Sequence, residues 1–96
     1  MKMLLIQSDE VAGSLSYLKA REKELLLFLI QNYNREFTPK EVSEEIGVTN
    51  KTIINRLAVL SKNGFVVPIL VKQRVRSYEL SDFTKNHKNE IVDKIK

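Results

Sequence analysis

The sequence contains no cysteine and a single histidine, His87. A disulfide framework and a thiolate zinc site are therefore excluded, and one imidazole cannot hold a metal cluster. The apolar run at residues 3–6 is far shorter than the roughly 20 residues that cross a bilayer, and it is also too short for a signal-peptide core. We therefore expect a cytoplasmic protein with no bound metal and no membrane segment.

Arrangements of residues that support catalysis are also scarce. The acids Glu41, Glu44 and Glu45 fall on one short predicted helix, where water solvates them and no pocket pairs them. The chain has no glycine-rich phosphate loop, no nucleophile with a neighbouring base and no metal-ligand spacing. We predict no enzyme activity, no cofactor and no small-molecule ligand.

Acidic residues are missing from one long stretch of the chain. The net charge is +4, but residues 1–48 carry −2 and residues 49–96 carry +6. No acid lies between Glu45 and Glu79, whereas six cations do: Lys51, Arg56, Lys62, Lys72, Arg74 and Arg76. Such a basic region suits a polyanion, although a modest basic excess is common in soluble proteins and decides nothing alone.

Residues 38–47 have the start and stop signals of a short helix. Thr38 can cap it, Pro39 suits its first position, and Glu41 completes a capping box. Phe37 precedes the cap, where it can pack against the helix as a hydrophobic staple. Gly47 follows where a left-handed residue ends a helix at little cost.

A second helix is predicted to follow at once, capped by Thr49 and closed at Gly64. Its apolar residues recur at three- and four-residue spacing and should face inward: Ile53, Ile54, Leu57 and Leu60. The opposite side would then carry hydrogen-bonding groups: Asn50, Lys51, Thr52, Asn55 and Arg56. Two helices joined by about three residues around a glycine form a helix-turn-helix, whose second helix enters the major groove of DNA.

The preceding segment, residues 18–33, predicts the main scaffold helix. Leu27 and Phe28 lie off its apolar stripe, so this helix is either buried on two sides or part of a dimer contact. Residues 1–17 are either an N-terminal arm or a short helix.

A hairpin is predicted after Gly64, with a first strand over residues 65–71 and a second over residues 75–80. Pro68 cannot donate to a ladder, so the first strand should be an edge or be interrupted there. The tip, Lys72-Gln73-Arg74, lacks the residues that favour a two-residue turn, and we expect a longer or irregular loop.

Residues 81–96 predict one last helix with a thin apolar stripe, which includes Phe83, His87, Ile91 and Ile95. So thin a stripe needs a partner, which would be either the scaffold helix or a second copy of the chain.

From residue 18 to residue 80 the chain resembles the winged helix-turn-helix DNA-binding domains of bacterial and archaeal regulators. The segment EIGVTNKTIINRLAVLSKNGFV carries the resemblance with its glycine, capping hydroxyl, recognition helix, second glycine and apolar strand. The resemblance implies a mainly α fold with a small β-hairpin (α+β): a three-helix core, a two-stranded wing and a C-terminal helix. It also implies that a set of residues faces the major groove (Thr49, Asn50, Lys51, Thr52, Asn55 and Arg56) and that others belong to the wing (Lys72, Arg74 and Arg76).

These observations together predict a sequence-specific double-stranded DNA-binding protein, a transcriptional regulator that acts as a homodimer at the nucleoid. The recognition helix, residues 50–63, would lie in the major groove and the wing, residues 65–80, on the backbone or in the minor groove. We divide the chain into residues 1–17, the DNA-binding domain 18–80, and a C-terminal helix 81–96 that could dimerise.

Duller alternatives remain open from sequence alone. The outward residues could be an ordinary solvated face, and the wing cations could only protect an exposed strand edge. The whole domain could instead be a protein-protein adaptor.

Overall fold

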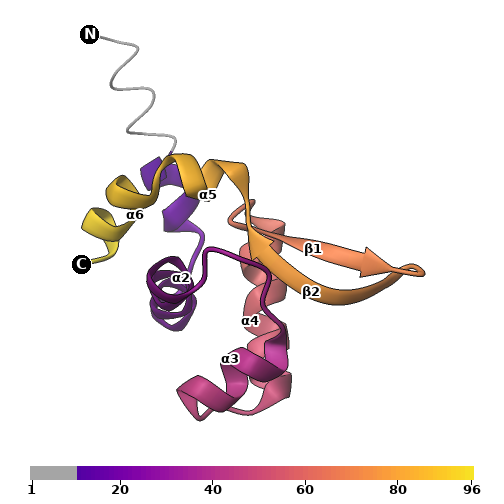
Figure 1. Cartoon of the computed structure of the whole chain (residues 1–96). Coiled ribbons are helices and arrows are strands. Elements are labelled where there is room, and N and C mark those ends of the chain that lie inside the picture. The colour runs from indigo at the N-terminus through magenta and orange to yellow at the C-terminus, as the bar shows by residue number, and fades with distance from the viewer. Residues whose placement is uncertain (1–10) are drawn as a thin grey trace, which may run out of the picture.

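The computed structural model describes residues 11–96 (Figure 1). Residues 11–16 are helical, which favours the short helix over the arm for that part of the N-terminal segment. The predicted arm or strand at residues 1–6 lies outside the described residues. None of the helices within residues 11–96 is both long and apolar enough to cross a lipid bilayer.

Three helices form the centre of the fold: α2 (Ala20–Asn32), α3 (Pro39–Ile46) and α4 (Asn50–Lys62). The scaffold helix α2 is slightly shorter than predicted, because extended backbone at Lys19 and Tyr33 bounds it. Its inner face buries Leu25, Leu26 and Leu29. Both α3 and α4 begin at the threonines that the sequence indicated, and together with α2 they enclose one hydrophobic core.

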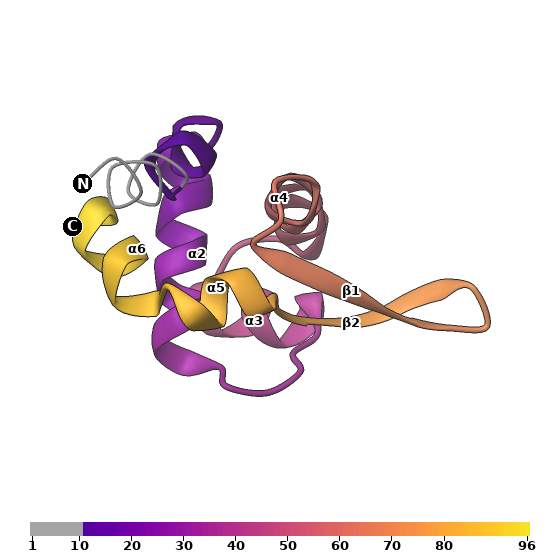
Figure 2. The same cartoon turned by 90° about the horizontal axis from the view of Figure 1, so that it is seen from above.

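The wing is an antiparallel hairpin of β1 (Val66–Val71) and β2 (Arg74–Leu80) that projects from the body (Figures 1 and 2). Tyr78 lies opposite Pro68, but both its backbone groups bond Phe37, with the Tyr78 N–H donating at 2.8 Å and its carbonyl accepting at 2.9 Å. The Pro68–Tyr78 pair is therefore not hydrogen-bonded, and the proline nitrogen faces away from β2. The predicted edge position of this strand is confirmed, and Pro68 costs the ladder no bond.

The expected longer or irregular loop at the wing tip is wrong. Val71 pairs with Arg74, so only Lys72 and Gln73 lie in the turn, at φ of 51° and 67°. Both are in the left-handed region that a two-residue hairpin turn requires, although neither is of a type that favours it. The twist of the paired strands imposes this conformation, and the register absorbs one extra residue, Arg76, as a bulge between Ser77 and Val75.

The predicted single C-terminal helix is also wrong, since the segment forms α5 (Asp82–Asn86) and α6 (Lys88–Ile95). The chain breaks at His87, whose φ of −121° and ψ of 23° are not helical. The Thr84 hydroxyl donates to the Phe65 carbonyl at 2.7 Å, which holds α5 at the base of the wing. The break then lets α6 turn along α2 and bury Ile91 (Figure 2).

The partner of the thin C-terminal stripe is therefore this chain's own scaffold helix. Thr84 and Ile91 are both fully buried, in the same interior as residues from α2 and α4. The C-terminal segment thus completes the core and needs no second copy of the chain to cover its apolar side.

Candidate nucleic-acid interface

The turn between α3 and α4 is held by backbone geometry and short-range hydrogen bonds. Gly47 has a left-handed φ of 81°, and its N–H donates to the Ser43 carbonyl at 2.9 Å. The Ser43 hydroxyl reaches across the turn to the Val48 carbonyl. The angle between the two helices is therefore fixed locally, before any ligand is present.

The first turn of α4 is closed by two threonines. The Thr49 hydroxyl accepts the backbone N–H of Thr52 at 3.3 Å, and the two hydroxyls lie 2.8 Å apart. Both hydroxyls are engaged in capping the helix. The geometry supports the expectation that Thr49 serves first as a cap, and it leaves the neighbouring Asn50 and Lys51 exposed at the helix start.

The inward face of α4 is narrower than predicted. Ile53, Leu57 and Leu60 are fully buried, as expected, but Ile54 is 42% exposed. Consecutive residues are about 100° apart around a helix, so Ile54 cannot share a narrow face with Ile53. The expectation that Ile54 faces the core is wrong. Asn55 is exposed on the outer side, in line with Lys51 one turn earlier.

Arg56 lies closer to the body than predicted. Its side chain is half-buried and lines a hollow of about 240 Å³ between α2 and the helix-turn-helix, together with Phe28 and Val48. The expectation of a fully solvent-facing Arg56 is corrected, because this position turns toward α2 and away from the centre of the exposed side. Its guanidinium is thus at the edge of the polar surface of α4.

The three wing cations predicted as site residues are all exposed, and each occupies a different position on the hairpin. Lys72 is in the turn, Arg74 begins β2, and Arg76 is the bulged residue. Arg76 also lines a hollow of about 230 Å³ near the start of α3. Since β1 packs against α4, the wing and the recognition helix belong to adjoining surfaces.

These cations are free of acidic partners within residues 11–96. The ion pairs in that part of the chain join Arg21 to Glu24 and Arg35 to Glu41, both outside α4 and the wing. The acid-free stretch seen in the sequence is therefore also unpaired in the folded chain, and its positive charge is available to a polyanion.

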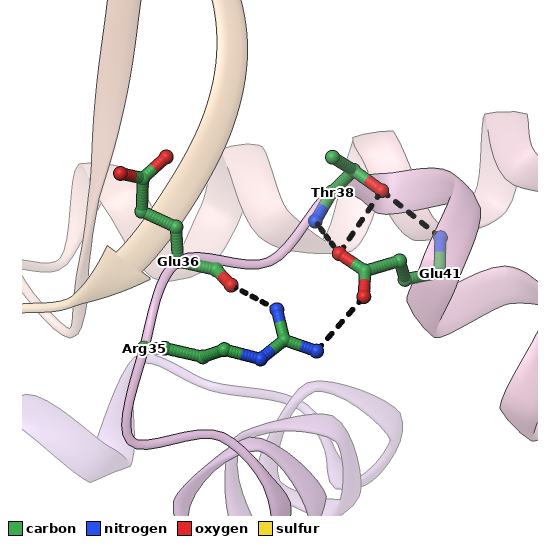
Figure 3. A network of polar contacts seen from close by, with 4 residues as sticks. All are labelled: Arg35, Glu36, Thr38 and Glu41. Atoms are coloured by element: carbon green, nitrogen blue, oxygen red, sulfur yellow. Dashed lines mark hydrogen bonds and ion pairs between the residues drawn. The ribbon is translucent and has the colours of Figure 1, made fainter.

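A polar network holds the entrance to α3 (Figure 3). Glu41 Oε1 accepts the Thr38 backbone N–H at 3.0 Å, while Glu41 Oε2 pairs with Arg35 at 3.0 Å. The Arg35 hydrogen bond, followed by the Thr38 backbone bond, holds the pKa of Glu41 below its ordinary value. The Arg35 guanidinium also lies over the Tyr33 ring, 5.3 Å from its centroid. This network explains why Glu41 is structural.

A protein-family profile described as HTH domain matches residues 21–78, which is more than half of the chain. The chain belongs to the winged helix-turn-helix family of DNA-binding domains. Among solved structures, the winged helix is similar to the crystal structure of transcriptional regulator PA3341, with a TM-score of 0.61 and 20% sequence identity. That alignment covers 98% of this chain and 68% of the other. A comparison with curated proteins gave no match.

Sequence reasoning missed one feature of this winged helix, the exposed aliphatic side chains of the wing. Val67, Leu70, Val71 and Val75 are all exposed. The signal was available, because an uninterrupted apolar strand such as VVPILV places side chains on both faces, and a hairpin beside a small core can bury only one.

Proposed function

We propose that this winged helix is a transcriptional regulator that binds double-stranded DNA in a sequence-specific manner in the cytoplasm. The observation that carries the proposal is the pairing of an exposed, polar α4 with a basic wing on an adjoining surface, with no acid neutralising either among the described residues. A surface of this kind provides phosphate contacts for affinity and side chains for base edges.

In the proposed complex, α4 lies in the major groove and its first turns read the bases. Asn50, Lys51 and Asn55 are exposed there and supply amide and ammonium donors. Thr49 and Thr52 hold the helix start, and Arg56 contacts phosphate from the edge of the groove. Lys72, Arg74 and Arg76 contact the DNA from the wing. This arrangement requires no cofactor and no catalytic group.

The test compares duplex binding by the full chain and by matched alanine variants over a range of salt concentrations. Lys51→Ala should weaken binding to the preferred sequence by about 1–3 kcal/mol. Arg74→Ala should weaken binding to all sequences and lower the salt slope by about one. Lys94→Ala is the matched control, because Lys94 is an exposed lysine on α6, away from α4 and the wing.

The preferred sequence comes from selecting bound molecules out of a random duplex library. No enriched sequence, combined with variants that bind as the unchanged chain does, would overturn the proposal. A chain that binds no duplex even at low salt would instead support the adaptor alternative.

Homodimerisation stays a prediction. The C-terminal stripe no longer supports it, because α6 packs on α2 of the same chain. What supports it is the incomplete burial of Leu27 and Phe28 on α2. Sedimentation at micromolar concentration, alone and with a two-fold symmetric duplex, tests it, and a monomer in both measurements would contradict it.

A further inference from the structure

The wing exposes more apolar surface than a solvated hairpin requires. Leu70 is 58% exposed and Val75 is 50% exposed, and Val67 and Val71 are exposed as well. Four exposed aliphatic side chains on one small element are an unusual concentration, because exposed apolar surface is ordinarily scattered singly. Their position on a projecting hairpin indicates a contact surface.

The apolar residues continue the core face of the hairpin past the edge of the body. At the base of the wing, Val66 and Leu80 pair across the strands and are buried against the helices. Farther out, Leu70 and Val75 pair in the same way. Because alternate residues of β1 share a face, Leu70 lies on the same side as Val66, but no helix covers it there.

The charge around these side chains decides what kind of partner fits. Lys72 in the turn and Arg74 at the start of β2 flank the exposed pair, and Arg76 follows it on the bulge. No acid occurs between Glu45 and Glu79. An apolar tip ringed by cations is complementary to a surface that is apolar inside and lined by phosphates. The minor groove of a duplex has this character.

Building on the proposed function, we propose that the wing is an apolar wedge that opens the minor groove and bends the DNA. Leu70 and Val75 press against the sugar and base edges, while Lys72 and Arg74 bind the phosphates on either side. An undistorted minor groove is about 6 Å wide. Two strands about 4.8 Å apart, with side chains on both, do not fit it unless it widens. The wing therefore favours sites beside flexible pyrimidine–purine steps.

The experiment measures the end-to-end distance of a doubly labelled duplex by fluorescence energy transfer, with the selected site at its centre. The unchanged chain should bend the duplex by about 20–90°. The variant Leu70→Thr/Val75→Thr keeps β-forming residues at exposed positions, so circular dichroism should show an unchanged fold. It should lose most of the bend and about tenfold in affinity. Val67→Thr, the same change on the other face near the wing base, is the control.

Each outcome separates the wedge from the proposed function. If the unchanged chain does not bind duplex DNA, the proposed function fails and the wedge fails with it. If the chain binds but leaves the duplex straight, or if the double variant bends it equally, only the wedge is overturned. If the double variant binds and bends DNA normally but sediments as a smaller species, the apolar wing is a contact between copies of the chain, and the wedge is again overturned.

Discussion

Replacing each glycine by alanine should divide the three glycines into two classes of opposite sign. Gly47 and Gly64 have φ values of 81° and 82°, whereas Gly13 lies within the helical residues 11–16 and has no positive φ. At all three positions an added Cβ meets nothing within 4 Å. Any change in stability must therefore come from the backbone and not from a clash.

The magnitude follows from that geometry. Alanine in the left-handed region costs about 1–2 kcal/mol, and the loss of unfolded-state freedom returns about 0.4–1 kcal/mol. Gly47→Ala should thus lower the free energy of unfolding by about 1 kcal/mol, and Gly64→Ala should do the same. Gly13→Ala should raise it by about 0.5–1 kcal/mol, because alanine is the better helix former.

Urea unfolding followed by circular dichroism measures all three, with an unchanged m-value showing that only stability has changed. In a domain of this size, 1 kcal/mol moves the melting temperature by about 4–8 °C. Equal melting temperatures for Gly13→Ala and Gly47→Ala would refute the reasoning, because the two variants differ only in the backbone conformation that they must adopt.

Three further predictions concern the caps, the wing tip and a buried phenol. Thr49→Ala should cost about 1 kcal/mol by removing the α4 cap, and Thr49→Ser should recover most of it, both by urea unfolding. Lys72→Asn/Gln73→Gly should raise the melting temperature, since it relieves two left-handed residues at about 1 kcal/mol each; an unchanged midpoint would contradict the turn geometry. Burial, with a smaller effect of Glu45, raises the pKa of Tyr33 to about 12. The unfolded phenol ionises first, so stability should fall by about 1.4 kcal/mol per pH unit above pH 10. Tyr33→Phe should lack this component in urea titrations at several pH values.

The helix boundaries were predictable because their causes are local. Thr38 and Thr49 bond to backbone groups three residues away, and Gly47 adopts a conformation that other residues rarely adopt. Such interactions depend on a few neighbouring residues, and those are visible in the sequence. The exposure of Asn50 and Lys51 followed from the same local periodicity.

The rotation of α4 was less predictable, as Ile54 and Arg56 show. Both flank the apolar stripe, and sequence spacing cannot tell which flank turns toward a neighbouring element. In the fold, α2 lies on the Arg56 side and half-buries it, whereas Ile54 is left in solvent.

The sequence by itself determined the family, the helix-turn-helix and its caps, the edge position of Pro68 and the acid-free basic stretch, since each depends on residue type and short spacing. Tertiary structure alone decided the strained turn at Lys72, the break at His87 and the packing of α6 on α2. Those features arise where distant segments meet, because strand pairing and core closure can outweigh local preference by several kcal/mol. The exposed apolar tip of the wing belongs to this second group: only the extent of the core shows that Leu70 lies beyond it.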